Sequence, residues 1–308
     1  MNTTTDRRVA VIGLGAMGGA MAATLHRAGW IVTGFDPFDG ARAAAAEAGI
    51  KTTANLADVA GTPYAVLSLP AASTVETTVP QLLAAPGTMA IVDTTTSEPA
   101  TSKKMAELAE ARGAAFVDAP VSGGRDGAAT GTLSAFVGAT DAALKTAEPV
   151  LLALTGGKYS HIGGPGSGNV VKLLNNVLAA ANLVSVGEAL GVAKAYGIDP
   201  ATAAASISEA SGGSRVSANM YPNWVLSGTH NSGFSLGLMA RDAALAVDVA
   251  AQIGETPALL AAVAGQWQDA LAVLGPRADF TEIARTVAPA ITPAGAPGTS
   301  VPGTTPVS

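Results

Sequence analysis

The chain has no cysteine among its 308 residues, which excludes disulfide bonds and thiol chemistry. It is also poor in basic residues, because 17 Lys and Arg against 23 Asp and Glu give a formal net charge of −6. This charge leaves no basic surface for nucleic acid or for an anionic membrane, so we expect neither as a partner. The first residues, MNTTTDRR, lack the apolar core of a signal peptide, and we expect a cytoplasmic protein.

Long uninterrupted apolar runs are also missing, despite a mean hydropathy of +0.36. Much of that excess is alanine, and the most apolar stretch, residues 173–187, contains Asn175, Asn176 and Asn182. We therefore expect this stretch to be a core helix and not a membrane span. At 308 residues the chain is long enough to fold as two domains.

A glycine-rich turn follows the first predicted strand. Residues 8–12 are a β-branched run that leads into Gly13-Leu14-Gly15-Ala16-Met17-Gly18 and then into an alanine-rich helical stretch. In this order Gly13 allows a tight turn, Gly15 lets a pyrophosphate approach the backbone, and Gly18 permits close packing of the helix on the strand. The start of the helix offers free N–H groups to phosphate, so the motif predicts a dinucleotide site.

An acidic residue follows the second predicted strand, residues 30–35. Asp36 lies eighteen residues after Gly18, near the spacing at which a carboxylate binds the ribose 2′-hydroxyl of NAD. Flavin and S-adenosylmethionine binders share the glycine pattern, but the ordered set of strand, glycines, helix, strand and acid favours NAD. We expect NAD as the cofactor, with NADP possible because the guanidinium of Arg42 could soften the repulsion of a 2′-phosphate.

Strands and helices alternate up to about residue 162, which predicts a mainly parallel sheet covered on both faces. Further strands are expected at residues 64–69, 89–93, 115–118 and 133–137. After Gly168 only helices are expected, at residues 169–196, 200–210, 217–226, 236–253, 257–272 and 280–287.

The predicted fold class is therefore α/β, an N-terminal Rossmann domain followed by an all-α domain. The expected boundaries are residues 1–163 for the Rossmann domain and 164–291 for the helical one, with the glycine-rich segment 163–168 as their junction. Residues 292–308 carry no charge and no periodicity, and we expect a disordered tail there.

One lysine stands inside an apolar helical pattern. Lys172 lies among valines and leucines at residues 170–178, so the helix is expected to be buried, and a cation on it is costly without partners. On a helix Asn169, Asn175 and Asn176 share a face with Lys172, which gathers four polar side chains into one site. The alternative is a lysine whose ammonium reaches solvent, with the asparagines as hydrogen bonders between helices.

A second glycine motif precedes the helical region. In Asp118-Ala119-Pro120-Val121-Ser122-Gly123-Gly124 a predicted strand ends, and Ser122, Gly123 and Gly124 can present a hydroxyl and consecutive backbone N–H groups to a carboxylate. The alternative is a plain turn between strands. Arg125 follows directly, either as a surface residue or as a second anion contact that selects a longer or more anionic substrate.

The three motifs together resemble the β-hydroxyacid dehydrogenase family, whose members include 3-hydroxyisobutyrate dehydrogenase, tartronate semialdehyde reductase and L-threonate dehydrogenase. The resemblance spans residues 8–287. It implies that Lys172 is the acid/base, that Asn176 orients Lys172 or the substrate, and that residues 122–124 hold the substrate carboxylate.

The resemblance also implies contacts to substrate and cofactor, and the sequence differs from the family pattern at one of these positions. Asn175 is expected to contact the substrate. Contacts to the cofactor are expected from Gly13, Leu14, Gly15, Ala16, Met17, Gly18, Asp36, Leu69, Pro70 and Thr95. A family motif of phenylalanine followed by a Lys-Asp pair stands here as Phe234 and Arg241-Asp242. Arginine keeps the positive charge but lacks the compact ammonium of lysine. Arg241, which is expected to contact the cofactor, therefore departs from the family pattern.

The implied chemistry is reversible hydride transfer between a small anionic β-hydroxy acid and NAD(P). A free lysine has a pKa of about 10.4, so the role of Lys172 as a base requires burial to lower it. Two alternatives are an imine reductase-like enzyme, which generally carries another residue at the position of Lys172, and a cofactor-binding scaffold without activity. No metal site is expected, and the apolar helices predict a homodimer or homotetramer.

Overall fold

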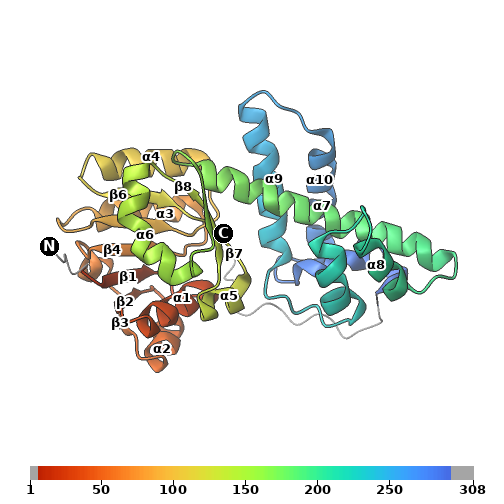
Figure 1. The fold of residues 1–308 in the computed structure, drawn as a ribbon, viewed down its shortest axis with the longest axis horizontal. Helices are drawn as coiled ribbons and strands as arrows, with labels where there is room; N and C mark the ends of the chain where they lie inside the picture. Colours follow the sequence, from red (N-terminus) through yellow and green to blue (C-terminus); the bar gives the residue numbers. More distant parts are fainter. Residues whose placement is uncertain (1–5, 293–308) are drawn as a thin grey trace. The chain divides into compact units, whose positions relative to one another are not determined.

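The structure is a computed structural model that describes residues 6–292. It divides into two compact units between Lys172 and Leu173, inside the long helix α7 (Ser167–Ala195). The first unit holds a mostly parallel sheet and the second is helical, which confirms the predicted fold class (Figure 1). The disordered tail expected at residues 292–308 lies outside the described residues, apart from Thr292.

The sheet of the first unit has the strand order β3-β2-β1-β4-β5-β6-β8-β7, with β9 paired to β8. The first six strands run parallel to their neighbours, whereas β8 runs antiparallel to β6 and to β7. The strands are β1 (Arg8–Ile12), β2 (Ile31–Phe35), β3 (Lys51–Thr53), β4 (Tyr64–Leu67), β5 (Ala90–Asp93), β6 (Ala115–Asp118), β7 (Val121–Ser122), β8 (Ser134–Gly138) and β9 (Tyr159–Gly163).

The central strands are buried on both faces because helices cover both. Along β1, Val9 and Val11 belong to a core shared with α1, α5 and α6, whereas Ala10 and Ile12 belong to a core shared with α3 and α4. Side chains alternate across a strand, so each central strand fills both cores. The covering helices are α1 (Ala16–Arg27), α2 (Asp39–Glu47), the 3₁₀ turn η1 (Leu56–Val59), α3 (Ala72–Leu82), α4 (Pro99–Glu110), α5 (Gly124–Thr130) and α6 (Asp141–Thr155).

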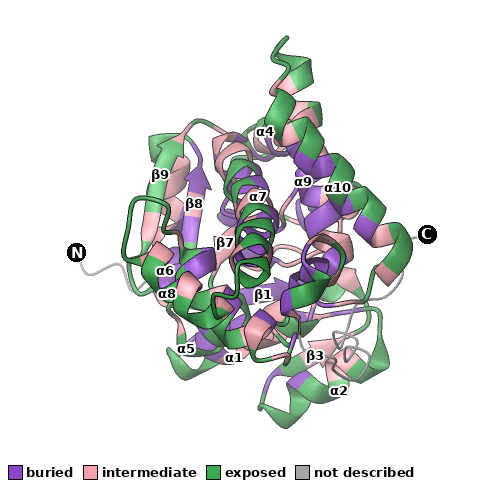
Figure 2. Cartoon of the chain, turned by 90° about the vertical axis from the view of Figure 1, so that its right-hand side faces the viewer, coloured by how far each residue is buried: buried purple, intermediate pink, exposed green. Residues whose placement is uncertain are grey.

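In the second unit α7 contributes one face to the core. Its buried residues recur every three or four positions, as at Leu173, Val177 and Ala180 (Figure 2). Leu174 is 41% exposed and Leu178 56% exposed. The expectation of a helix buried all round is therefore wrong, because the helices of the unit pack against one side of α7 only. Those elements are α8 (Pro200–Ser208), η2 (Val216–Leu226), α9 (Leu236–Gln252), α10 (Ala258–Leu274), η3 (Phe280–Ile283), α11 (Ala284–Val287) and η4 (Pro289–Ile291).

Of the helices in residues 6–292, α7 is the one that is long and apolar enough to cross a membrane by length and composition. Half of that apolar stretch is buried inside the structure, as in the core helix of a soluble protein. Among the same residues there is no group of three or more His, Asp or Glu side chains that could hold a metal ion.

Candidate functional site

The glycine turn has the geometry that a dinucleotide site requires. Gly13 adopts a φ of 90°, and a Cβ there would lie 2.3 Å from the carbonyl oxygen of Ser68. A Cβ on Gly18 would lie 1.8 Å from the carbonyl oxygen of Gly13, whereas one on Gly15 would meet nothing within 4 Å. Helix α1 starts at Ala16, and its N-cap Gly15 supplies no side-chain cap, as at a helix start whose N–H groups bind a phosphate. This cradle fits a pyrophosphate.

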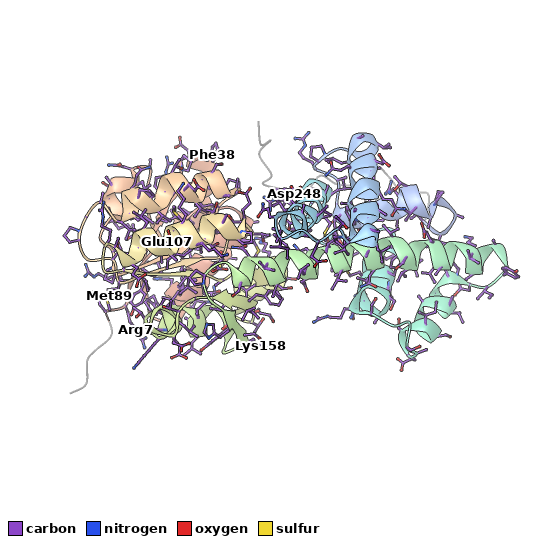
Figure 3. All side chains as sticks on the ribbon, turned by 90° about the horizontal axis from the view of Figure 1, so that it is seen from above. Arg7, Phe38, Met89, Glu107, Lys158 and Asp248 are labelled. Carbon is purple, nitrogen blue, oxygen red and sulfur yellow. The ribbon has the colours of Figure 1, made fainter. Side chains whose placement is uncertain are left out.

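Asp36 ties the glycine turn to the end of β2. Its Oδ2 accepts a hydrogen bond from the Leu14 N–H at 2.8 Å, and its Oδ1 accepts one from the Phe38 N–H at 2.9 Å. Each carboxylate oxygen keeps a second lone pair, which suits ribose hydroxyls. Arg42 donates to the backbone carbonyl of Asp36 and pairs with Asp39, while the Phe38 side chain stands at the surface (Figure 3).

The ends of β4 and β5 bring Leu69, Pro70 and Thr95 beside this turn. The Thr95 hydroxyl oxygen accepts a hydrogen bond from the Leu69 N–H at 3.1 Å, and the Thr95 N–H donates to Asp93 Oδ1 at 3.0 Å. In the strand order β1 lies between β2 and β4, so these residues lie at the carboxyl ends of strands where the chain order reverses. Open α/β sheets bind their ligands at such a point.

The glycine-rich loop at residues 122–124, which is predicted to hold the substrate carboxylate, begins in a strand that the sequence did not predict. Ser122 belongs to β7 and pairs with Ser134 of β8, so the motif is more than a plain turn. Gly123 and Gly124 have φ angles of 125° and 60°, in the left-handed region that favours glycine. Arg125 is exposed in the first turn of α5, and no carboxylate of the described residues pairs with it.

Lys172 is 8% exposed, and it is the last residue of the first unit. The three asparagines predicted to share its face differ in their surroundings. Asn169 is fully buried and bonded to the Ser97 N–H and to Ser102, whereas Asn175 is exposed and donates to Asn176 at 3.1 Å. Asn176 is buried, four residues beyond Lys172 on α7.

In the second unit Asp242 joins two of the predicted residues. Its Oδ2 accepts a hydrogen bond from Asn176 Nδ2 at 2.7 Å, and its Oδ1 accepts bonds from Nε and Nη2 of Arg241 at 3.1 and 2.8 Å. Asp242 is 1% exposed, so its charge is compensated by these donors. It orients the Asn176 amide, a role that the sequence alone did not predict.

Asp118 is a second buried carboxylate with an unpredicted role. At the end of β6 it accepts hydrogen bonds from the N–H groups of Gly166 and Asn169. Burial raises its pKa to about 6, against the lowering effect of these bonds. Asp93, its partner in the strand register, has its pKa raised to about 7 by burial and by the charge of Asp118. The sequence did contain a signal for this role, because Asp93 and Asp118 each stand at the end of a strand.

Two family models together match nearly the whole described chain. Residues 8–163 match the NAD binding domain of 6-phosphogluconate dehydrogenase, and residues 166–287 match the NAD-binding domain of NADP-dependent 3-hydroxyisobutyrate dehydrogenase.

The relatives agree with these models. The 2-(hydroxymethyl)glutarate dehydrogenase of Eubacterium barkeri is 36% identical over 264 residues, covering 84% of this chain and 87% of that protein. The structure of Mycobacterium tuberculosis 3-hydroxyisobutyrate dehydrogenase with L-serine is 31% identical with a TM-score of 0.84, covering 91% of this chain and 99% of that one. A Streptomyces aurantiacus imine reductase is more distant, at 24% identity and a TM-score of 0.61 with 91% and 99% covered, and shares the fold.

Proposed function

Because this chain belongs to the β-hydroxyacid dehydrogenase family, it is an NAD(P)-dependent oxidoreductase acting on CH–OH groups, and we propose that Lys172 is its acid/base. The proposed reaction interconverts a small β-hydroxy acid and its semialdehyde or keto form. The observation that carries the proposal is a lysine at a buried position of the helix whose first turn is bonded to the first unit.

The cradle at residues 13–18, together with Asp36, Leu69, Pro70 and Thr95, would hold the dinucleotide. When bound, the nicotinamide accepts or supplies the hydride. Lys172 would take the hydroxyl proton during oxidation and return it to the carbonyl oxygen during reduction. As the base it would have to be the neutral amine, which burial generally favours over the ammonium. Asn176, oriented by Asp242, would donate its remaining N–H to the substrate oxygen or to Lys172.

The substrate carboxylate would lie against Ser122, Gly123 and Gly124, with Asn175 as a further contact. The test is a spectrophotometric screen with NAD and with NADP. Its panel holds 3-hydroxyisobutyrate, L-serine, glycerate, threonate, 4-hydroxybutyrate, 2-(hydroxymethyl)glutarate and sulfonated analogues. Turnover of at least one hydroxy acid supports the proposal. Reduction of cyclic imines without any carbinol turnover contradicts it in favour of an imine reductase, and no turnover at all favours a scaffold.

Arg125 is proposed as a second anion contact, because it is exposed directly after residues 122–124 and has no carboxylate partner among the described residues. Losing a charged hydrogen bond costs about 1.5 to 3 kcal/mol, so Arg125→Met should raise KM for the best acidic substrate roughly 10- to 100-fold. The cofactor KM should stay constant. Lys158→Met removes another exposed cation of this unit and serves as the control (Figure 3). An unchanged substrate KM would make Arg125 an ordinary surface residue.

Asp36 is proposed to set a preference for NAD over NADP, because its carboxylate would bind a ribose hydroxyl and repel a 2′-phosphate. Asp36→Asn keeps an oxygen that can accept from Leu14 or Phe38 but removes the charge. We expect it to narrow the ratio of kcat/KM for NAD over NADP by about tenfold, a free-energy difference of about 1.4 kcal/mol. A wild-type enzyme with higher kcat/KM for NADP would contradict this role.

We further propose a cytoplasmic homodimer or homotetramer. Leu174, Leu178 and Val192 are exposed apolar side chains spaced along α7, and Tyr196, directly after its last residue, is exposed as well. Such a stripe on one helix supports burial against a second copy of the chain.

A further inference from the structure

The start of α7 is bonded to β6, to α4 and to the segment before α4. Asp118, at the end of β6, accepts from the Gly166 N–H at 2.7 Å with Oδ1 and from the Asn169 N–H at 3.0 Å with Oδ2. The Asn169 side chain accepts from the Ser97 N–H at 2.9 Å and donates to Ser102 Oγ of α4 at 3.0 Å. Asp118 and Asn169 are both fully buried, so these bonds do not compete with water.

The start of α7 can lie this close to Asp118 and the sheet only because the contacting backbone positions are glycines. A Cβ on Gly138 would lie 2.5 Å from Asp118 Oδ1, and one on Gly168 would lie 2.3 Å from the Phe136 carbonyl oxygen. Gly166 has a φ of 91°, and a Cβ there would lie 2.7 Å from the Pro99 carbonyl oxygen. Gly166 and Gly168, before and within the first turn of α7, therefore allow a close approach of the helix to the sheet.

The charges also favour this arrangement. An anion at the start of a helix is stabilised by the helix dipole, and Asp118 takes that place for α7. Its pKa of about 6 leaves it ionised at pH 8. Asp93 faces it from β5, and Asp93 Oδ2 has no hydrogen-bond partner among the described residues. Asp93 is therefore the member of the pair that holds its proton to higher pH.

We propose that Asp118 and Asn169 are positioning residues that fix the backbone of Lys172. Lys172 lies three residues after Asn169, within one turn of the same helix. The bond from Ser97 to Asn169 ties this turn to the segment that carries Thr95, so the two bonded residues set where Lys172 stands relative to the nucleotide-binding strand ends. Proton transfer tolerates little displacement, since an error of 1 Å can cost about 10²-fold in rate. The inference rests on the proposed role of Lys172.

The test uses Asp118→Asn and Asn169→Leu in the full chain. Each should lower kcat roughly 10- to 100-fold while the KM values for substrate and NAD change less than about threefold.

Asp279→Asn is the matched control. Asp279 is a fully buried carboxylate that caps the short helix η3 in the second unit, so its loss lowers stability without touching α7. If Asp118→Asn and Asn169→Leu fail to fold, the milder Ser102→Ala is used instead. It removes one bond to Asn169 and should lower kcat by up to about tenfold. If the variants lose no more kcat than Asp279→Asn, the proposal is overturned.

Hydrogen exchange tests the same bonds without any turnover. Amides of residues 166–172 should exchange faster in Asp118→Asn and Asn169→Leu than in the wild type, while those of the glycine turn stay unchanged. Unchanged exchange at residues 166–172 would overturn the positioning role. A wild type without dehydrogenase activity would instead overturn the proposed function, and a wild type whose variants keep kcat would overturn the positioning role alone.

Discussion

Replacing Lys172 with alanine is expected to lower kcat by about 10²- to 10⁴-fold, the range for the loss of a general acid/base. Lys172 would act on the substrate oxygen and not on the dinucleotide, so the dissociation constant for NAD should remain close to that of the wild type. Alanine is the best helix former, and the substitution lies within the 29-residue helix α7, so the backbone should keep its course.

Lys194→Ala provides the matched control, because Lys194 is an exposed lysine near the end of the same helix. Circular dichroism and a titration with NAD establish that both variants are folded, and steady-state kinetics on the best substrate of the screen gives kcat. The assignment is wrong if Lys172→Ala retains more than about half of the wild-type kcat, since the loss of a general acid/base lies far outside that range.

The parts of the fold that the sequence predicted well are those in which several local signals agree. The strand at residues 8–12 was predicted with its observed bounds, because a β-branched run, a glycine turn and a helix follow one another there. Three strands were missed: β3, β7 and β9. β3 and β7, with three and two residues, are too short to show a period, and β9 has no buried residue that would alternate with exposed ones. The helix expected at residues 217–226 is a π-helix, and Pro222 inside it removes a backbone donor.

The candidate site shows the same limit for side chains. The helical period placed Asn169, Asn175 and Asn176 on one face, but the period cannot say which neighbouring elements supply their partners. Asn169 is bonded to Ser97 and Ser102 from earlier parts of the chain, and Asn176 to Asp242 from a later helix. These contacts join residues more than 60 positions apart in sequence. Only the fold brings them together, which is why the roles of Asp118 and Asp242 were not predicted.

The glycines of the nucleotide turn are expected to fail in two different ways when a methyl group is added. In Gly18→Ala the new Cβ would lie 1.8 Å from the carbonyl oxygen of Gly13, a backbone atom that cannot move aside. We expect the free energy of unfolding to fall by about 1 to 3 kcal/mol or more, since overpacking of a core commonly costs that much. Chemical denaturation of the full chain measures this loss.

Gly15→Ala should instead leave the fold intact and impair the cofactor site. Its φ of −62° suits alanine, and no atom lies within 4 Å of the new Cβ, so the free energy of unfolding should change by less than about 0.5 kcal/mol. The methyl group would occupy the space through which the pyrophosphate approaches the backbone. We expect the dissociation constant for NAD to rise roughly 100-fold, which corresponds to about 2.7 kcal/mol.

Gly40→Ala is the control, because Gly40 also has open space around it but lies in α2, outside the turn. Unchanged NAD affinity in Gly15→Ala would show that the pyrophosphate does not bind at this turn. Reduced stability would mean that Gly15, like Gly18, is needed for the packing of α1.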